Sequence, residues 1–129
     1  MARLPPLSED EIARRLPVWA ILSEAFQDTE LEDSDYDRMA RELAQSGYYA
    51  DEVEHIYRRE VAPAFCVNML SAAGEWRGWP DDFIKKRVLQ KRNSFLSNLV
   101  CRLLISGHIQ DEWNKLHIRL VRRPEDVSE

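Results

Sequence analysis

The sequence predicts an all-α protein, a compact bundle of six to seven helices in one domain. Apolar residues recur at three- and four-residue intervals along most of the chain, and no segment combines strand-like alternation with hairpin turn residues. The chain has 129 residues, 44% of them hydrophobic and 32% charged, which suits one soluble globule. We therefore expect one domain over residues 1–129, with residues 1–7 as an extended lead-in and residues 122–129 as a frayed tail.

The first helical region contains a proline. Ser8 and Glu11 have the spacing of a capping box, which predicts a helix start one residue after the serine. Because Pro17 has no backbone N–H, we expect it to divide the region into a short turn, Glu9–Arg15, and a second helix, Pro17–Phe26. The buried face of the second helix is predicted to contain Trp19, Leu22 and Phe26.

Two further helices follow an acidic segment. The first covers roughly Asp35–Gln45, with Asp33 or Ser34 as its cap and Gly47 after its end. Its apolar stripe consists of Tyr36, Met39, Ala40 and Leu43. The second begins near Asp51, and its apolar face consists of Val53, Ile56, Tyr57 and Val61.

The central segment from Glu60 to Asp82 is the most apolar part of the chain. Pro63 predicts the end or a kink of one helix and the start of a buried one, which Gly74 ends. Two tryptophans and an arginine follow: Trp76, Arg77 and Trp79. They form either an exposed binding site, since Trp and Arg dominate such sites, or a plug in which both indoles fill the core. The core interpretation is the more common arrangement.

The last third of the chain predicts two or three helices. From Pro80 the helical period continues to Ser106, as one long helix or as two joined near Asn93. Gly107 is expected to stop it, and a final helix is expected over Gln110–Leu120, with a strand over residues 117–121 as the alternative. Across the whole chain, the residues predicted with most regularity as core are Trp19, Phe26, Phe65, Leu70, Leu99 and Leu103.

Compartment and cysteine chemistry follow from what the sequence contains. It has no apolar run long enough to span a membrane and no signal-peptide pattern at its start, so we expect a cytoplasmic protein with no membrane association. Cys66 and Cys101 lie in apolar helical patterns without a CxxC motif. Two buried free thiols are expected, and a disulfide or a reactive thiol is the alternative.

Residues suited to metal binding or catalysis do not form a known motif. Asp33-x-Asp35-x-Asp37 has the spacing of an EF-hand start, but Arg38 and Ala44 stand where the glycine and the final glutamate are required. The remaining candidates are Glu52, His55 and Glu60 in one group, and His108, Asp111, Glu112 and His117 in another. We expect no bound metal, no cofactor and no enzymatic activity. An enzyme or metal-binding protein that uses these clustered carboxylates and histidines is the alternative.

Charge is distributed unevenly. Residues 1–62 contain 15 acids and 7 bases, whereas residues 63–129 contain 8 acids and 11 bases, within a net charge of −5. The densest acidic segment, here called the acidic run, contains seven acids and no base: Glu24, Asp28, Glu30, Glu32, Asp33, Asp35 and Asp37. We expect the acidic run to be exposed and to bind a basic protein partner. Nucleic acid is a poor candidate because the net charge is negative. A homodimer in which the acidic half meets the basic half of another copy is a further alternative.

Three motifs carry a resemblance. The segment LPVWAILSEAFQDTE from Leu16 to Glu30, EVAP from Glu60 to Pro63, and GEWRGWP from Gly74 to Pro80 together resemble a family of small bacterial proteins of uncharacterised function. This resemblance extends from about residue 11 to residue 85 and supplies no catalytic residue. In size, acidity and helical content the chain is also similar to bacterial immunity proteins, which neutralise a toxin by covering its active site. A basic, toxin-like partner is what that similarity implies.

Overall fold

The computed structural model describes residues 6–26, 31–70, 80–92, 94–104 and 106–120, and within these ranges it contains helices and no strand. The predicted all-α fold is confirmed. The elements are α1 (Glu9–Ser23), the 3₁₀ turn η1 (Glu24–Phe26), α2 (Asp33–Ala44), α3 (Ala50–Ile56), the π-helical turn η2 (Tyr57–Val61), α4 (Ala62–Leu70), α5 (Asp81–Lys91), α6 (Phe95–Leu104) and α7 (Ser106–Leu120).

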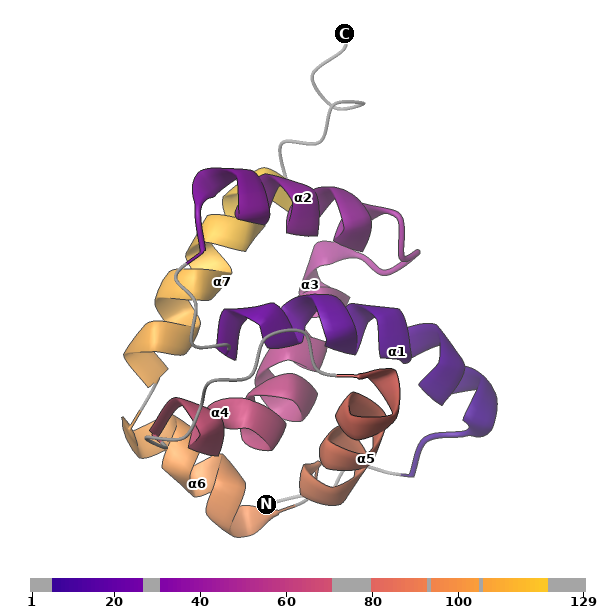
Figure 1. Cartoon of the computed structure of the whole chain (residues 1–129), viewed down its shortest axis with the longest axis vertical. Helices are drawn as coiled ribbons and strands as arrows, with labels where there is room; N and C mark the ends of the chain where they lie inside the picture. The colour runs from indigo at the N-terminus through magenta and orange to yellow at the C-terminus, as the bar shows by residue number, and fades with distance from the viewer. Residues whose placement is uncertain (1–5, 27–30, 71–79, 93, 105, 121–129) are drawn as a thin grey trace, which may run out of the picture.

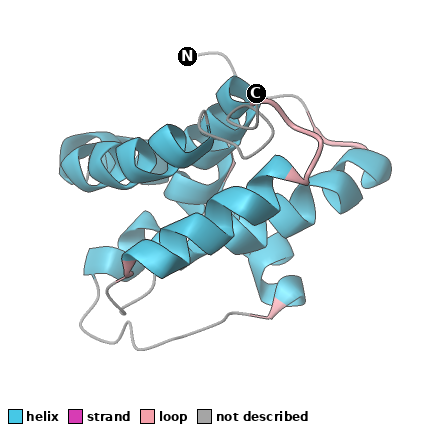
Figure 2. Cartoon of the chain, turned by 90° about the horizontal axis from the view of Figure 1, so that it is seen from above, coloured by secondary structure: helices cyan, strands magenta, loops and turns pink. Residues whose placement is uncertain are grey.

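Three helix pairs make the largest contacts, α2 with α7, α4 with α6, and α1 with α5. In Figure 1, α1 crosses the middle of the molecule, with α2 above it and α7 along one side. The pair α4 and α6 and the helix α5 lie on the side of α1 opposite α2. Figure 2, seen from above, shows that the described chain is almost entirely helical.

Pro17 does not divide the first helix, so this part of the prediction is wrong. α1 is continuous from Glu9 to Ser23, and Pro17 lies inside it. The carbonyl that loses its intrahelical bond belongs to Ala13, and both Ala13 and Pro17 are exposed, so water can satisfy that carbonyl. Burial of the following Val18 and Trp19 holds the helix together across the proline. The predicted cap is confirmed, because the Glu11 amide donates to Ser8 Oγ at 3.1 Å.

Pro63 is accommodated by a wider turn rather than by a break. The amide of Ala62 donates to the carbonyl of Tyr57, five residues back, so η2 is a π-turn that leads directly into α4. In a regular helix the ring of Pro63 would clash with the carbonyl four residues before it, that of Arg59. Widening the preceding turn by one residue relieves that conflict and keeps α3, η2 and α4 in one nearly continuous path.

Several helix boundaries differ from the expected ones. α5 and α6 are separate helices with a break around residues 92–94, which confirms the two-helix alternative. α2 begins at Asp33 rather than Asp35, because Asp35 turns back from inside the first turn to accept the Glu32 amide at 2.8 Å. Gly107 lies inside the first turn of α7, so the predicted stop there is wrong. Gly47, in contrast, follows α2 with a φ of +90°, the left-handed conformation that is expected of a glycine ending a helix.

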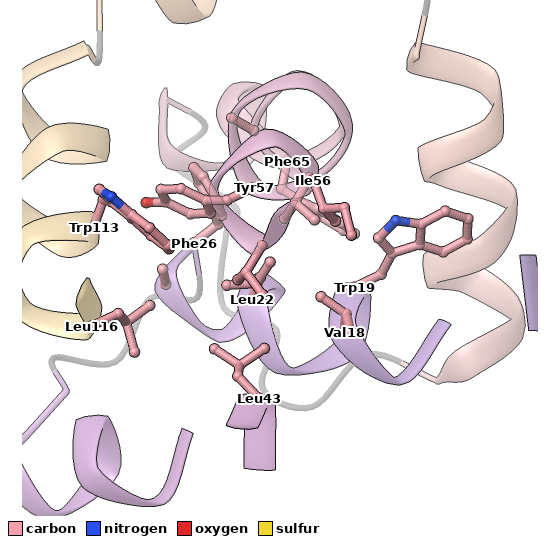
Figure 3. Close-up of a cluster of buried hydrophobic side chains, with 14 of the residues drawn as sticks. Val18, Trp19, Leu22, Phe26, Leu43, Ile56, Tyr57, Phe65, Trp113 and Leu116 are labelled. Atoms are coloured by element: carbon pink, nitrogen blue, oxygen red, sulfur yellow. The ribbon is translucent and has the colours of Figure 1, made fainter. Parts of the chain in front are cut away.

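One core joins all the described helices. Trp19, Phe26 and Phe65 are buried as predicted. In the close-up of Figure 3, Phe26 lies beside Tyr57, and Trp19 lies on the other side of Leu22. Leu99 and Leu103 are 38% and 68% exposed, so their assignment to the core is wrong. The side chain of Leu70, also predicted as core, lies outside the described side chains.

Candidate functional site

The acidic run is only partly available to a partner. Glu24 at the end of α1 accepts hydrogen bonds from Arg38 of α2 at 2.5 and 3.2 Å, and its side chain is only 25% exposed. Asp35 is occupied by the Glu32 amide, while Glu32 itself is exposed. The expectation that the whole run is exposed is therefore wrong for Glu24 and Asp35, because each serves a local interaction.

The exposed acids of α2 face cations from α7. Arg119 donates to Asp37 at 2.7 Å and to Asp33 at 3.4 Å. Arg119 and Lys115 also lie over the ring of Tyr36, at 5.4 and 5.2 Å from its centre. Arg119 and Asp37 are 82 residues apart along the chain. Counting charges within each segment of the sequence therefore could not show that these carboxylates pair with a base. The pattern of alternate acids is the first turn of a helix and not a calcium loop.

Two acids of the run and the aromatic site lie outside the described residues. These are Asp28 and Glu30, and Trp76, Arg77 and Trp79.

A buried carboxylate connects the middle of α1 with η2 and with the residue that follows α5. Glu60 of η2 is fully buried and accepts from Arg15 Nη1 at 2.6 Å, from Arg92 Nε at 3.0 Å and from the Trp19 indole N–H at 2.9 Å. We call these four residues the Glu60 cluster. Two cations and one neutral donor satisfy the carboxylate, which is what burial of a charge requires.

Glu11 extends the Glu60 cluster toward the surface. It accepts from Arg15 Nε at 2.6 Å and from the hydroxyl of Tyr48 at 2.7 Å. Together with the pull of the Arg15 charge, these bonds hold the pKa of Glu11 below its usual value. Burial and the bond to Glu11 raise the pKa of Tyr48 above its usual value, so this hydroxyl keeps its proton and remains a donor.

A pocket of about 310 Å³ opens between α1 and α3, next to these residues. We call it the α1–α3 pocket. Its lining consists of Arg15, Tyr48, Asp51, Glu52, His55 and Ile56. Tyr48 and Ile56 are buried and form an apolar base, whereas Asp51, Glu52 and His55 are exposed. Because Arg15 is already bonded to two carboxylates, the charge that this pocket offers to a ligand is negative.

Exposed acids surround the same end of the molecule. Glu9 and Asp10 occupy the first turn of α1, and Asp51 and Glu52 occupy the first turn of α3. None of the four forms an ion pair with any residue that the structure describes. Glu52 accepts the Tyr49 amide at 2.8 Å, but unlike Asp35 it remains exposed. The bond between Tyr48 and Glu11 holds the two helix starts together. We call these four acids the α1–α3 acidic edge. Charge counting along the chain missed it because its members come from segments more than 40 residues apart. The available signal was the presence of acids in the first turns of two helices.

Three of the four residues predicted as a group on α7 have structural contacts, and the fourth, Asp111, is exposed. His108 Nε2 lies 3.0 Å from the carbonyl of Ala25, and His117 stacks on Trp113 at 5.6 Å between ring centres. Glu112 accepts from the buried Tyr36 hydroxyl at 2.7 Å. Within the described part of the chain, no group of three or more His, Cys, Asp or Glu side chains is arranged to hold a metal ion.

Comparisons with known proteins identify a family for the sequence but assign it no activity. A family model described as "Domain of unknown function (DUF7079)" matches residues 13–119. Neither the curated proteins nor the solved structures contain a significant match. Among the helices that the structure describes, none has both the length and the apolar character needed to cross a membrane.

Proposed function

The chain belongs to the DUF7079 family of unknown function, and from that premise we propose that it is a small protein-binding module for a basic partner protein. In its more specific form, the proposal is an immunity-type protein of bacterial origin that neutralises a toxin by covering it. The observation that carries the proposal is the α1–α3 acidic edge, which lies beside the α1–α3 pocket.

Ion pairing inside the fold leaves this edge negative. Most arginines of the acidic half are bonded to carboxylates, namely Arg14, Arg15, Arg38 and Arg58. The four acids of the α1–α3 acidic edge keep their charges toward solvent. A concentrated surface charge of one sign raises the rate of encounter with an oppositely charged protein and makes that rate depend on salt.

The exposed acids of α2 are a weaker candidate for the same role. Asp33 and Asp37 lie beside Arg119 and Lys115, which reduce the local negative potential. Arg14, an exposed base on the same helix as Glu9 and Asp10, is paired with Glu11. The geometry therefore favours the α1–α3 acidic edge over the acidic run as the principal partner-binding surface.

The test uses a double charge reversal with a position-matched control. Asp10→Lys with Asp51→Lys changes the edge, while Asp81→Lys with Asp82→Lys changes the first turn of α5 by the same total charge. The candidate partner is a basic protein encoded by the adjacent gene, and association is followed by stopped-flow fluorescence at low and high salt. We expect the edge variant to associate about tenfold more slowly at low salt and the control about as fast as wild type.

Equal slowing of both variants would show that only net charge matters and would remove the edge from the proposal. If the adjacent gene's product does not bind at all, the immunity-type proposal is wrong. Circular dichroism of each variant shows whether the helices are intact, so that loss of fold is not mistaken for loss of binding.

A homodimer is the second candidate. Lys85 and Lys86 of α5 are exposed and form no ion pair with the residues that the structure describes, so they offer a basic counterpart to the α1–α3 acidic edge of another copy. Sedimentation velocity over a hundredfold range of concentration distinguishes the two. A constant monomer mass contradicts the homodimer, whereas a dimer that dissociates with salt supports it.

A further inference from the structure

The two cysteines of the chain meet where α4 and α6 pack together. Cys101 Sγ lies 3.1 Å from the carbonyl of Ala62, and Cys66 Sγ lies 3.6 Å from the carbonyl of Ser97. Ala62 is one helical turn before Cys66, and Ser97 is one turn before Cys101. Each thiol therefore contacts the carbonyl that lies one helical turn before the other cysteine. The two cysteine side chains consequently lie against each other where α4 packs on α6.

Small residues allow this close approach. Ala62 and Ser97 are buried at the contact and have short side chains, and α4 with α6 is among the largest helix contacts in the fold. A disulfide requires Cα atoms about 4.4–6.8 Å apart, a spacing that two helices reach only where small residues face each other. The reciprocal thiol-to-carbonyl distances, and the hydrogen bond between the two thiols, show that the two side chains are in contact where α4 packs on α6.

We propose that Cys66 and Cys101 are an intrachain oxidation site, which a small peroxide converts into a disulfide joining α4 to α6. The peroxide oxidises one thiol to a sulfenic acid and is itself reduced, releasing one water. The second thiol then attacks the sulfenic sulfur, forming the S–S bond and releasing a second water. The two thiols together lose two electrons and two protons, and one peroxide accepts them. This inference does not depend on the proposed function.

Burial determines how the site reacts. Both cysteines are thiols outside any disulfide and are buried, Cys66 completely and Cys101 to 94%. The hydrogen bond with Cys66, followed by burial, raises the pKa of the Cys101 thiol, so this thiol is not activated in the closed fold. Oxidation should therefore be slow, and it should proceed through local opening of α6 rather than through a permanently exposed thiolate.

The test is peptide mapping of the folded wild-type protein after treatment with hydrogen peroxide. Alkylation under denaturing conditions, without reductant, should find no free thiol. Digestion should give one linked species that contains the Cys66 and Cys101 peptides and separates on reduction. The midpoint of thermal unfolding should rise by several degrees in the oxidised protein and return with reductant, because the bond closes a long loop.

Two serine variants are the matched controls. In Cys66→Ser and Cys101→Ser the chain contains a single thiol, so no disulfide should form within it. After oxidation to the sulfenic acid, that thiol should be trapped by dimedone. Recovery of two alkylatable thiols in the wild type, or links between chains only, would overturn the proposal. A lower unfolding midpoint in the oxidised protein would show that the native helix contact does not accommodate the bond.

Discussion

Replacing Glu60 should destabilise the fold more than replacing other side chains of similar size. It satisfies two arginines and an indole N–H in the interior, so its removal leaves Arg15 and Arg92 without the central charge of the cluster. We expect Glu60→Ala to lower the free energy of unfolding by about 3–5 kcal/mol in urea titrations. Glu54→Ala, which removes only a partly exposed pair with Arg58, should cost less than about 1 kcal/mol. Similar costs for the two variants would contradict this role for Glu60.

Glu11 makes stability depend on pH in the acid range. Its pKa is lowered in the fold, so it contributes stability that is present above its unfolded value, near 4.5, and is lost as pH falls below it. The difference in unfolding free energy between wild type and Glu11→Gln should therefore shrink as pH falls from about 6 to about 3. The exposed Glu9→Gln variant should show a much smaller change over the same range. A constant difference for Glu11→Gln would mean that its ion pair contributes no stability.

At the level of single residues, the sequence shows residue type but not the partner. The motif EVAP suggested the end of a helix, and nothing local indicated that its glutamate is the most buried acid of the described chain. The partners of Glu60 are 45 and 32 residues away along the chain, in α1 and after α5. Contacts at that separation are set by how helices pack, which local patterns do not encode.

Among the elements, α6 shows why a regular stripe does not identify the buried face. Leu96, Leu99 and Leu103 repeat at helical spacing, yet all three are exposed. The buried side contains the smaller Ser97 and Cys101, because α4 approaches closely there. Helical period fixes which residues share a face, and the size of the facing residues decides which face packs inward. The stripe of α2 was predicted correctly because this helix has only one apolar side.

Leucine truncation tests this orientation of α6. Leu103→Ala should change the free energy of unfolding by less than about 1 kcal/mol, because its side chain is mostly exposed. Leu22→Ala on α1, where the side chain is fully buried, should cost about 2–5 kcal/mol. Guanidinium unfolding of both variants provides the comparison, and a loss of more than about 2 kcal/mol for Leu103→Ala would indicate that something covers this face.

The molecule as a whole should unfold as one unit. A single cluster of buried residues includes side chains from α1 to α7, and the Glu60 cluster joins α1, η2 and the residue after α5. Tyr36 and Glu112 form a second polar link, between α2 and α7. Calorimetry should therefore give one transition whose calorimetric and van't Hoff enthalpies agree. Two resolved transitions would show that α2 and α7 unfold apart from the rest.

The π-turn before Pro63 has a consequence for comparing this chain with its relatives. A π-turn is equivalent to an α-helix into which one residue has been inserted. A family member that lacks the proline is expected to lack that residue too, so its alignment should contain a single-position gap within residues 57–61. The apolar pattern should continue in register on both sides of the gap. A one-residue deletion within residues 57–61 can accordingly be combined with Pro63→Ala. Of the changes to this turn, this combination is the one most compatible with Val53 and Phe65 staying on the same inner side of the helix.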